Sequence, residues 1–146
     1  MADIVGSPTA KDLCRLYAEN FGKLNGHPMT ETWILDYGRE FEFRPRPAAV
    51  EEGPPKNCFQ NAMRLADEFN YVEGFVTLPT IPLLIHHAWN VDDDGYVVDA
   101  TLNDPQNSYF GVEIPDVSSV EEIVGSTYSY SILHKLPGRE LVESLD

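Results

Sequence analysis

The fold is decided by residues 57–101, which read NCFQNAMRLADEFNYVEGFVTLPTIPLLIHHAWNVDDDGYVVDAT. In the first part of this stretch, apolar side chains recur at helical spacing from Phe59 to Phe69. Asn57 precedes them, and asparagine is one of the residues that best cap the start of a helix. The pattern therefore predicts a helix that carries Cys58 in its first turn.

The second part of the stretch is rich in Val, Ile, Tyr and Phe and is interrupted by turn residues, as consecutive strands are. The predicted strands cover residues 71–77, 83–91 and 96–101. Asp94-Gly95 lies between the last two, and this dipeptide favours the positive φ angles of a tight hairpin. We therefore expect the helix to pack against an antiparallel sheet.

The flanking segments add further elements of both kinds. Ser7 and Pro8 suit the start of a first helix over residues 8–22, which would bury Cys14 as a small apolar residue. The other predicted elements are a short helix at 30–37, a half-buried strand at 41–43, an exposed proline-rich connection at 45–56, a strand at 109–114, a helix at 116–124, a strand at 126–133 and a terminal helix at 138–145. This order predicts a single α+β domain over residues 1–146, with its strands arranged as a meander.

The charge of the chain is its unusual bulk property. Among 146 residues, 24 are acidic and 10 are basic, which gives a formal net charge of -14. Such a charge repels phosphate backbones, so we expect no nucleic acid as a ligand. The first residues lack the basic start and apolar run of a secretory signal, and no stretch approaches a membrane span. Two cysteines make no disulfide framework and suit a reducing compartment, so we expect the cytoplasm.

Three residues in the deciding stretch have the chemistry of a cysteine nucleophile and its supports. A thiol attacks as its thiolate, and a helix start such as the one predicted at Cys58 lowers a cysteine pKa. His87 on one predicted strand would activate this thiol and later protonate the leaving group. Asp99 on the next strand would orient the imidazole. The hairpin brings His87 and Asp99 together only with a modest register offset or a bulge.

The same residues resemble a known family. Asn57-Cys58-Phe59, His87-Ala88-Trp89 and Val98-Asp99-Ala100-Thr101 are similar to the transglutaminase-like branch of the papain-like superfamily, in which Cys, His and Asp follow in this order. The resemblance implies a papain-like fold, with Cys58 as nucleophile, His87 as general base and acid, and Asp99 as its orienter.

This chain departs from the family pattern around the cysteine. The glutamine that helps to form the papain-type oxyanion hole has no counterpart in residues 51–57, and Phe59 stands where many relatives have tryptophan. The backbone amide of Cys58 could serve instead, with the side chain of Asn57 or Gln60. We expect Trp89 to contribute to the same oxyanion or substrate site.

We therefore expect cysteine-dependent acyl transfer on an amide bond through a Cys58 thioester, with no cofactor and no metal ion. Attack by water would make the protein a protease, an amidase or a deamidase, and attack by an amine would make it a transglutaminase. A protein or peptide is the expected substrate. The alternative is a non-catalytic acidic interaction protein, or an inhibitor, that binds a basic partner surface.

Each of the three residues could also have a purely structural role. Cys58 could be a buried cysteine, His87 a hydrogen-bonded strand histidine, and Asp99 the cap of a strand end or a partner of Thr101. His86 competes with His87, because neighbours in a strand face opposite sides. The ordered set of three favours catalysis, and the Ala-Trp that follows His87 favours that histidine.

Two further features of the strands do not indicate a functional site. Glu73 interrupts an apolar strand, and we interpret it as a charge on an edge strand. Asn90, Asp92, Asp94 and Gly95 match the opening of a calcium-binding loop, but Thr101 stands where the bidentate glutamate belongs, which argues against calcium.

Overall fold

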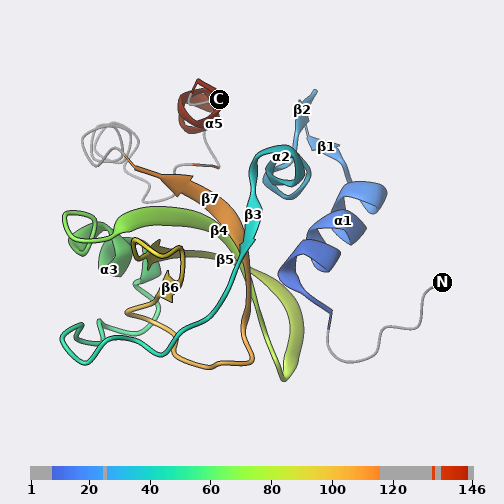
Figure 1. Cartoon of the computed structure of the whole chain (residues 1–146). Coiled ribbons are helices and arrows are strands. Elements are labelled where there is room, and N and C mark those ends of the chain that lie inside the picture. The colour runs from blue at the N-terminus through green and yellow to red at the C-terminus, as the bar shows by residue number, and fades with distance from the viewer. Residues whose placement is uncertain (1–7, 25, 116–132, 134–135, 145–146) are drawn as a thin grey trace.

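The computed structural model describes residues 8–24, 26–115, 133 and 136–144. The helix predicted at 116–124 and the strand predicted at 126–133 lie outside the described residues, except for Leu133. The elements, in chain order, are α1 (Ala10–Asn20), β1 (Lys23–Leu24), β2 (His27–Pro28), α2 (Thr30–Tyr37), β3 (Arg39–Phe41), α3 (Cys58–Arg64), β4 (Asn70–Leu78), β5 (Ile81–Val91), β6 (Val97–Val98), β7 (Ser108–Ile114) and α5 (Leu136–Glu143) (Figure 1). The protein has the predicted α+β character.

The main sheet has five antiparallel strands in the order β3-β7-β4-β5-β6. The predicted meander is wrong, because β7 does not lie beside β6 but returns to pair with β4. Strand β4 offers β7 a continuous ladder from Tyr71 to Thr77, whereas β6 pairs with β5 through two residues only. The strand predicted at 96–101 is correspondingly too long, and Asp99 lies just beyond the end of β6.

The sheet curls until its two edges meet. Glu42, directly after the edge strand β3, forms a bridge with Tyr96, directly before the other edge strand β6. The Val97 amide donates to the Glu42 carbonyl oxygen at 3.0 Å. Because of this curl, side chains on the inner face can reach one another across the sheet as well as along it.

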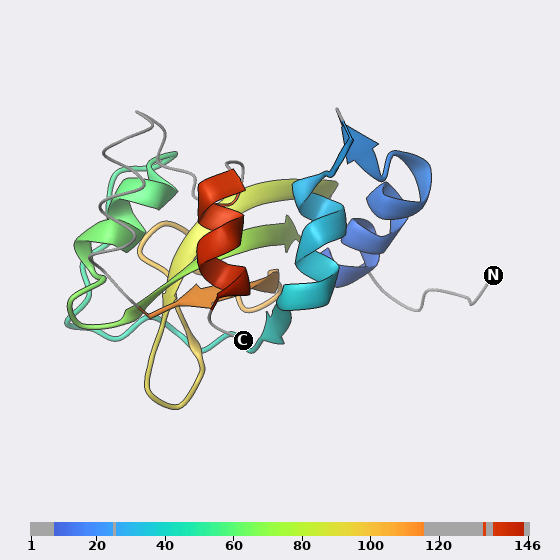
Figure 2. The same cartoon turned by 90° about the horizontal axis from the view of Figure 1, so that it is seen from above.

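Each face of the curled sheet has its own core. All five strands supply the inner cluster, which consists of Phe41, Val72, Val76, Trp89, Val91, Val97 and Tyr109. The outer face packs against helices, and its cluster includes Ala10, Cys14, Trp33, Ile34, Ala62, Tyr71, Phe75, Phe110 and Val142. Figures 1 and 2 show α1, α2 and α5 along one side of the sheet and α3 at its far end. Successive residues of β4 and β5 therefore point into two different environments.

Helix α1 begins two residues later than predicted. Thr9, rather than Ser7, is its N-cap: the Thr9 hydroxyl accepts from the Asp12 amide, and the Asp12 carboxylate accepts from the Thr9 amide. Ser7 lies outside the described residues. Cys14 is buried in α1, as predicted, and burial, aided by the charge of Glu31, raises its pKa to about 12.

No helix in the described part of the chain is long and apolar enough to cross a membrane.

Candidate active site

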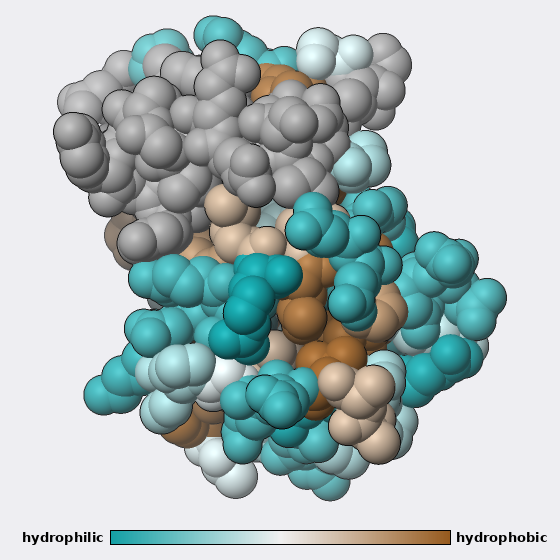
Figure 3. Space-filling model, turned by 90° about the vertical axis from the view of Figure 1, so that its left-hand side faces the viewer, coloured by the Kyte–Doolittle hydropathy of each residue, from teal (hydrophilic) through white to brown (hydrophobic). Residues whose placement is uncertain are grey.

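Cys58 is the first residue of α3 and is half-buried. Asn57 occupies the predicted N-cap position, but its side chain makes no capping hydrogen bond and is exposed. The helix ends at Arg64, so it is shorter than the apolar pattern predicted and its dipole has less effect on the thiol. The face on which α3 lies has a hydrophobic patch bordered by hydrophilic residues (Figure 3).

Asn61 fixes the middle of α3 to the chain around it. This residue is 2% exposed, and its amide nitrogen donates to the Pro54 carbonyl at 3.0 Å and to the Thr101 hydroxyl at 2.8 Å. The segment before the helix passes so close that a Cβ on Gly53 would lie 2.1 Å from the Asn61 side-chain oxygen. Asn61 therefore ties the Cys58 helix directly to the segment that follows Asp99.

His87 and Asp99 form a buried pair. The Nε2 atom of His87 lies 2.8 Å from Oδ2 of Asp99, and the two side chains are 3% and 2% exposed. Since Asn90 pairs with Val98, Asp99 lies opposite Trp89 and diagonal to His87. The contact spans this diagonal: Asp99 directly follows the last residue of β6, and its side chain reaches away from β6 toward His87.

Three further hydrogen bonds hold Asp99 in place. Its Oδ1 atom accepts from the amides of Thr101 at 2.8 Å and Leu102 at 3.0 Å. Its Oδ2 atom also accepts from the Tyr109 hydroxyl at 2.8 Å. Thus Asp99 bonds Thr101, as its structural role predicted, and orients His87 at the same time.

Tyr109 is a site residue that the sequence did not reveal. It lies on β7, is 1% exposed, and reaches Asp99 across the inner face of the sheet. Tyr109 and Asp99 come together because β7 lies beside β4 and the sheet is curled. A reader of the sequence who does not know this strand order has no reason to assign the tyrosine at the start of a strand to the site.

The Cys58 side chain lies close enough to His87 to help raise the pKa of the imidazole, after burial and Asp99. Because Nε2 of His87 faces Asp99, Nδ1 is the ring nitrogen left for the thiol. The structure therefore brings Cys58 close to the hydrogen-bonded pair of His87 and Asp99. His86, the competing histidine, points to the outer face of the sheet, where it contacts Phe59 and Phe75.

The electrostatics favour a charged imidazole at this site. Burial lowers the pKa of His87, but the hydrogen bond and charge of Asp99 and the interaction with Cys58 outweigh it and raise the pKa to about 9. Burial raises the pKa of Asp99, but His87 and the Leu102 and Thr101 amides act more strongly, so its pKa is lowered. At neutral pH His87 is therefore an imidazolium beside a carboxylate.

Trp89 lies in the inner core and is 1% exposed, and its contribution to the oxyanion or substrate site stays a prediction. Its ring stacks against His87 with centroids 5.9 Å apart, and it meets Phe41 and Tyr109 edge to face. Trp89 therefore supports the imidazole from the inner core. Gln60, by contrast, is exposed on α3, two residues after Cys58.

Glu73 is part of a second buried histidine–carboxylate pair, and its assignment to an edge strand is wrong. Strand β4 lies between β7 and β5, and Glu73 is fully buried on its outer face. One of its oxygens lies 2.9 Å from His86 Nε2 and accepts from the Leu133 amide at 2.9 Å. The other accepts from the Tyr71 hydroxyl at 2.9 Å. Both faces of β5 thus carry a histidine that is bonded to a buried carboxylate.

The residues of the calcium-like signature have other partners. Asn90 is buried and donates to the Ala62 carbonyl of α3 at 2.9 Å. Arg44 lies 3.4 Å from an Asp92 oxygen and 3.7 Å from an Asp94 oxygen. No group of His, Cys, Asp and Glu in the described ranges could hold a metal ion.

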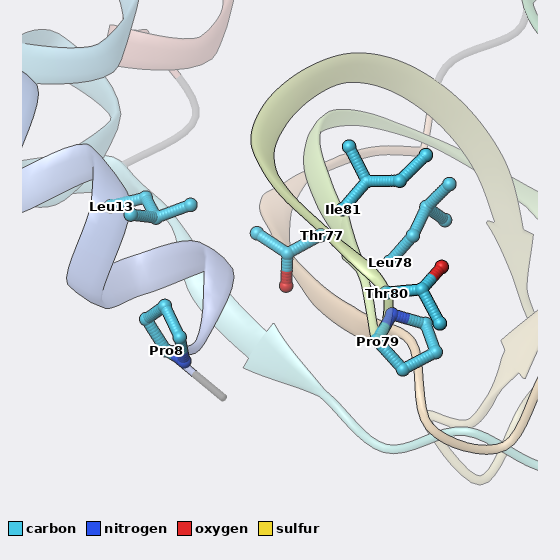
Figure 4. Close-up of a pocket in the computed structure, with 7 residues that line it drawn as sticks. All are labelled: Pro8, Leu13, Thr77, Leu78, Pro79, Thr80 and Ile81. Atoms are coloured by element: carbon cyan, nitrogen blue, oxygen red, sulfur yellow. The ribbon is translucent and has the colours of Figure 1, made fainter. Parts of the chain in front are cut away.

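Two pockets lie away from this site. An apolar pocket of about 80 Å³ lies between Pro8 and Leu13 at the start of α1 and residues 77–81 of the β4–β5 turn (Figure 4). A second pocket, of about 380 Å³, lies between residues 49–51 and the end of α3. Neither of these two pockets is lined by Cys58, His87 or Asp99.

Comparisons with protein-family models, curated proteins and solved structures find no match for this chain. The resemblance to the transglutaminase-like branch of the papain-like superfamily therefore stays a prediction. The site consists of a half-buried thiol close to a charged imidazole that is hydrogen-bonded to a buried carboxylate.

Proposed function

We propose that this protein is a cysteine-dependent acyl-transfer enzyme that acts on an amide bond. The observation that carries the proposal is the buried His87–Asp99 hydrogen bond of 2.8 Å, with the half-buried Cys58 thiol close enough to His87 to affect the pKa of its ring. Thiol, base and orienting group in this arrangement are the parts that nucleophilic catalysis requires. The proposal includes a papain-like, transglutaminase-like fold and a cytoplasmic location, where the thiol would stay reduced.

In the first step, the Cys58 thiolate would attack the amide carbonyl carbon and form a carbon–sulfur bond. The carbon–nitrogen bond would then break, and the His87 imidazolium would give its proton to the departing ammonia or amine. The product is a thioester on Cys58 with a neutral His87. Asp99 would keep Nε2 of the ring protonated and Nδ1 directed at the sulfur.

In the second step, His87 would accept a proton from water or from a primary amine as that group attacks the thioester. The carbon–sulfur bond would break, the thiolate would return, and His87 would again be an imidazolium. Water yields a carboxylic acid, and an amine yields a new amide. We propose a protein or peptide as the substrate.

The negative oxygen that forms during attack needs hydrogen-bond donors near Cys58. We assign this role to the Cys58 backbone amide, with the exposed side chain of Asn57 or Gln60 as the second donor. Trp89 packs against the His87 ring from the inner core, so we expect the substrate to approach from the side of these donors.

The proposal is tested by acylation of the full-length protein with p-nitrophenyl acetate, followed by intact-protein mass spectrometry. We expect a burst of p-nitrophenol and one acetyl group on Cys58, which then leaves either to water or faster when a primary amine such as glycine amide is added. The dependence on added amine distinguishes a hydrolase from a transferase.

Cys58→Ser and Cys14→Ser are matched variants for this experiment, because they remove the two cysteines of the chain one at a time. We expect Cys58→Ser to abolish the burst and Cys14→Ser to leave it unchanged. Acylation that is equal on both cysteines, or that is unchanged in His87→Ala, would contradict the proposed function.

A further inference from the structure

We propose that the cluster of Tyr71, Glu73 and His86 positions the nucleophile, by holding Phe59 and with it the start of the Cys58 helix. This inference rests on the proposed function, since it assigns positioning residues to the same site. It concerns the outer face of β5, opposite the face that carries His87.

The carboxylate of Glu73 is held in one position by the hydrogen bonds of the cluster. A buried charge is costly unless donors satisfy it, and Glu73 is fully enclosed in the central strand β4. Tyr71, His86 and the Leu133 amide each lie 2.9 Å from its oxygens. A carboxylate with this many partners has one preferred orientation, and so has the imidazole that it binds.

Leu133 connects the cluster to the end of the chain. Its amide donates to Glu73, and its carbonyl oxygen accepts from Nε of Arg139 in α5 at 2.8 Å. Arg139 is 8% exposed and also donates to the Thr30 hydroxyl at 2.8 Å. Leu133 thus lies between a buried anion and a buried cation, which fixes Glu73 from the side of the helices.

His86 connects the Glu73 carboxylate to α3 through a packing contact. Its ring meets the Phe59 ring edge to face, with centroids 5.1 Å apart, and packs on its other side against Phe75 at 5.3 Å. Phe59 directly follows Cys58 in the first turn of α3. Burial and the charge and hydrogen bond of Glu73 raise the pKa of Tyr71, and Cys58 lies near enough to add to this shift, so the cluster and the sulfur are neighbours.

This arrangement explains how a helix as short as α3 could keep its sulfur against His87. Seven residues make less than two full turns, and such a helix depends on tertiary contacts for its position. Asn61 and Asn90 anchor its middle, and the His86–Phe59 contact anchors its first turn. Without that contact, the Cys58 sulfur would lie less close to the His87 ring.

The experiment compares the pH profile of Cys58 alkylation by iodoacetamide in five full-length proteins: wild type, His86→Ala, His86→Gln, His87→Ala and His27→Ala. Peptide mass spectrometry follows Cys58 and Cys14 separately. The control removes an exposed histidine of β2 that has no part in either pair. We expect His86→Ala to move the midpoint of Cys58 labelling to higher pH and to lower the rate at pH 6.5 by about fivefold, the effect of roughly one weakened hydrogen bond.

His86→Gln should restore part of the wild-type profile, because its amide can donate to Glu73. A merely stabilising role for His86 would lower the melting temperature and expose Cys14, while the labelling midpoint of Cys58 in the folded fraction would stay unchanged. That result, or equal profiles for His86→Ala and His27→Ala, would overturn the inference. If the proposed function itself is wrong, His87→Ala would leave the Cys58 profile unchanged. That result distinguishes failure of the proposed function from the two results that would overturn the inference.

Discussion

Two neighbouring histidines of β5 have almost the same hydrogen-bonded partners and different surroundings. His87 is bonded to Asp99, which also accepts from Tyr109, and His86 is bonded to Glu73, which also accepts from Tyr71. The His87 group lies inside the curled sheet, and the His86 group lies under the helices. A buried histidine–carboxylate–tyrosine group therefore does not by itself indicate catalysis.

The two histidines differ in the group that each contacts besides its carboxylate and the tyrosine. His87 lies close enough to the Cys58 thiol for it to affect the pKa of the imidazole, whereas the rings of Phe59 and Phe75 pack against His86. A charged imidazole beside a thiol stabilises the thiolate, and an imidazole between two aromatic rings acts mainly by packing. We therefore assign proton transfer to the His87 group and positioning to the His86 group.

The largest expected effect is the loss of either buried carboxylate. Asp99→Ala and Glu73→Ala each leave several buried donors without an acceptor, so we expect each to lower the free energy of unfolding by about 3–5 kcal/mol. Urea unfolding followed by circular dichroism measures this. Glu113→Ala is the matched control: Glu113 pairs with Arg39 at the surface, and its loss should cost below about 1 kcal/mol. A cost for Asp99→Ala as small as the control's would contradict the burial argument.

The next effect is a pH dependence that belongs to the His87 group. The folded-state pKa of His87 is raised from 6.5 to about 9, so its stabilisation is complete below pH 6.5 and is lost as the pH rises through 9. A pKa difference of one unit corresponds to about 1.4 kcal/mol. The free energy of unfolding should therefore fall by about 3 kcal/mol over this pH range. The pKa of Asp99 is lowered from its ordinary value of 3.8. The stability that the Asp99 carboxylate contributes is therefore present above pH 3.8 and is lost as the pH falls below that value.

This dependence is measured by urea unfolding of the wild type and of His87→Gln between pH 6 and pH 9.5. We expect a decline in the wild type and a flatter curve in the variant. His86→Gln should keep the decline, because the effect belongs to His87. Parallel curves for the wild type and His87→Gln would be evidence against a raised His87 pKa.

The smallest effect distinguishes the two tyrosines. Tyr109→Phe and Tyr71→Phe each remove one buried hydrogen bond, and each should cost about 1 kcal/mol of stability. Only Tyr109→Phe should change the NMR titration of His87. Its hydroxyl shares the Asp99 oxygen with His87, so its loss should raise the pKa of His87. A change of equal size in Tyr71→Phe would show that the two groups are not separate.

The sequence predicts the parts of this structure that depend on local pattern. Helix α2 and strands β4, β5 and β7 lie where periodicity and composition place them, and Gly95 has the positive φ of 87° that its turn requires. The set of Cys58, His87 and Asp99 could be recognised from the sequence for the same reason, because His87 and Asp99 belong to one hairpin.

The parts that escaped prediction depend on contacts between distant segments. No local pattern places β7 beside β4, so neither the approach of Tyr109 to Asp99 nor the central position of β4 was accessible. Glu73 illustrates the consequence. A glutamate in an apolar strand normally faces solvent, and here it is buried because His86, Tyr71 and the distant Leu133 amide satisfy it.

The central claim, that His87 activates Cys58, is tested most directly by the rate of Cys58 alkylation by iodoacetamide as a function of pH in the wild type and in His87→Ala. We expect the wild-type thiol to react well below the ordinary cysteine pKa of about 8.5, while Cys14 stays unreactive. In His87→Ala the profile should move up to that ordinary value, with a loss of about 10- to 100-fold at pH 6.5. Identical profiles for the two proteins, both centred near the ordinary value, would contradict the claim.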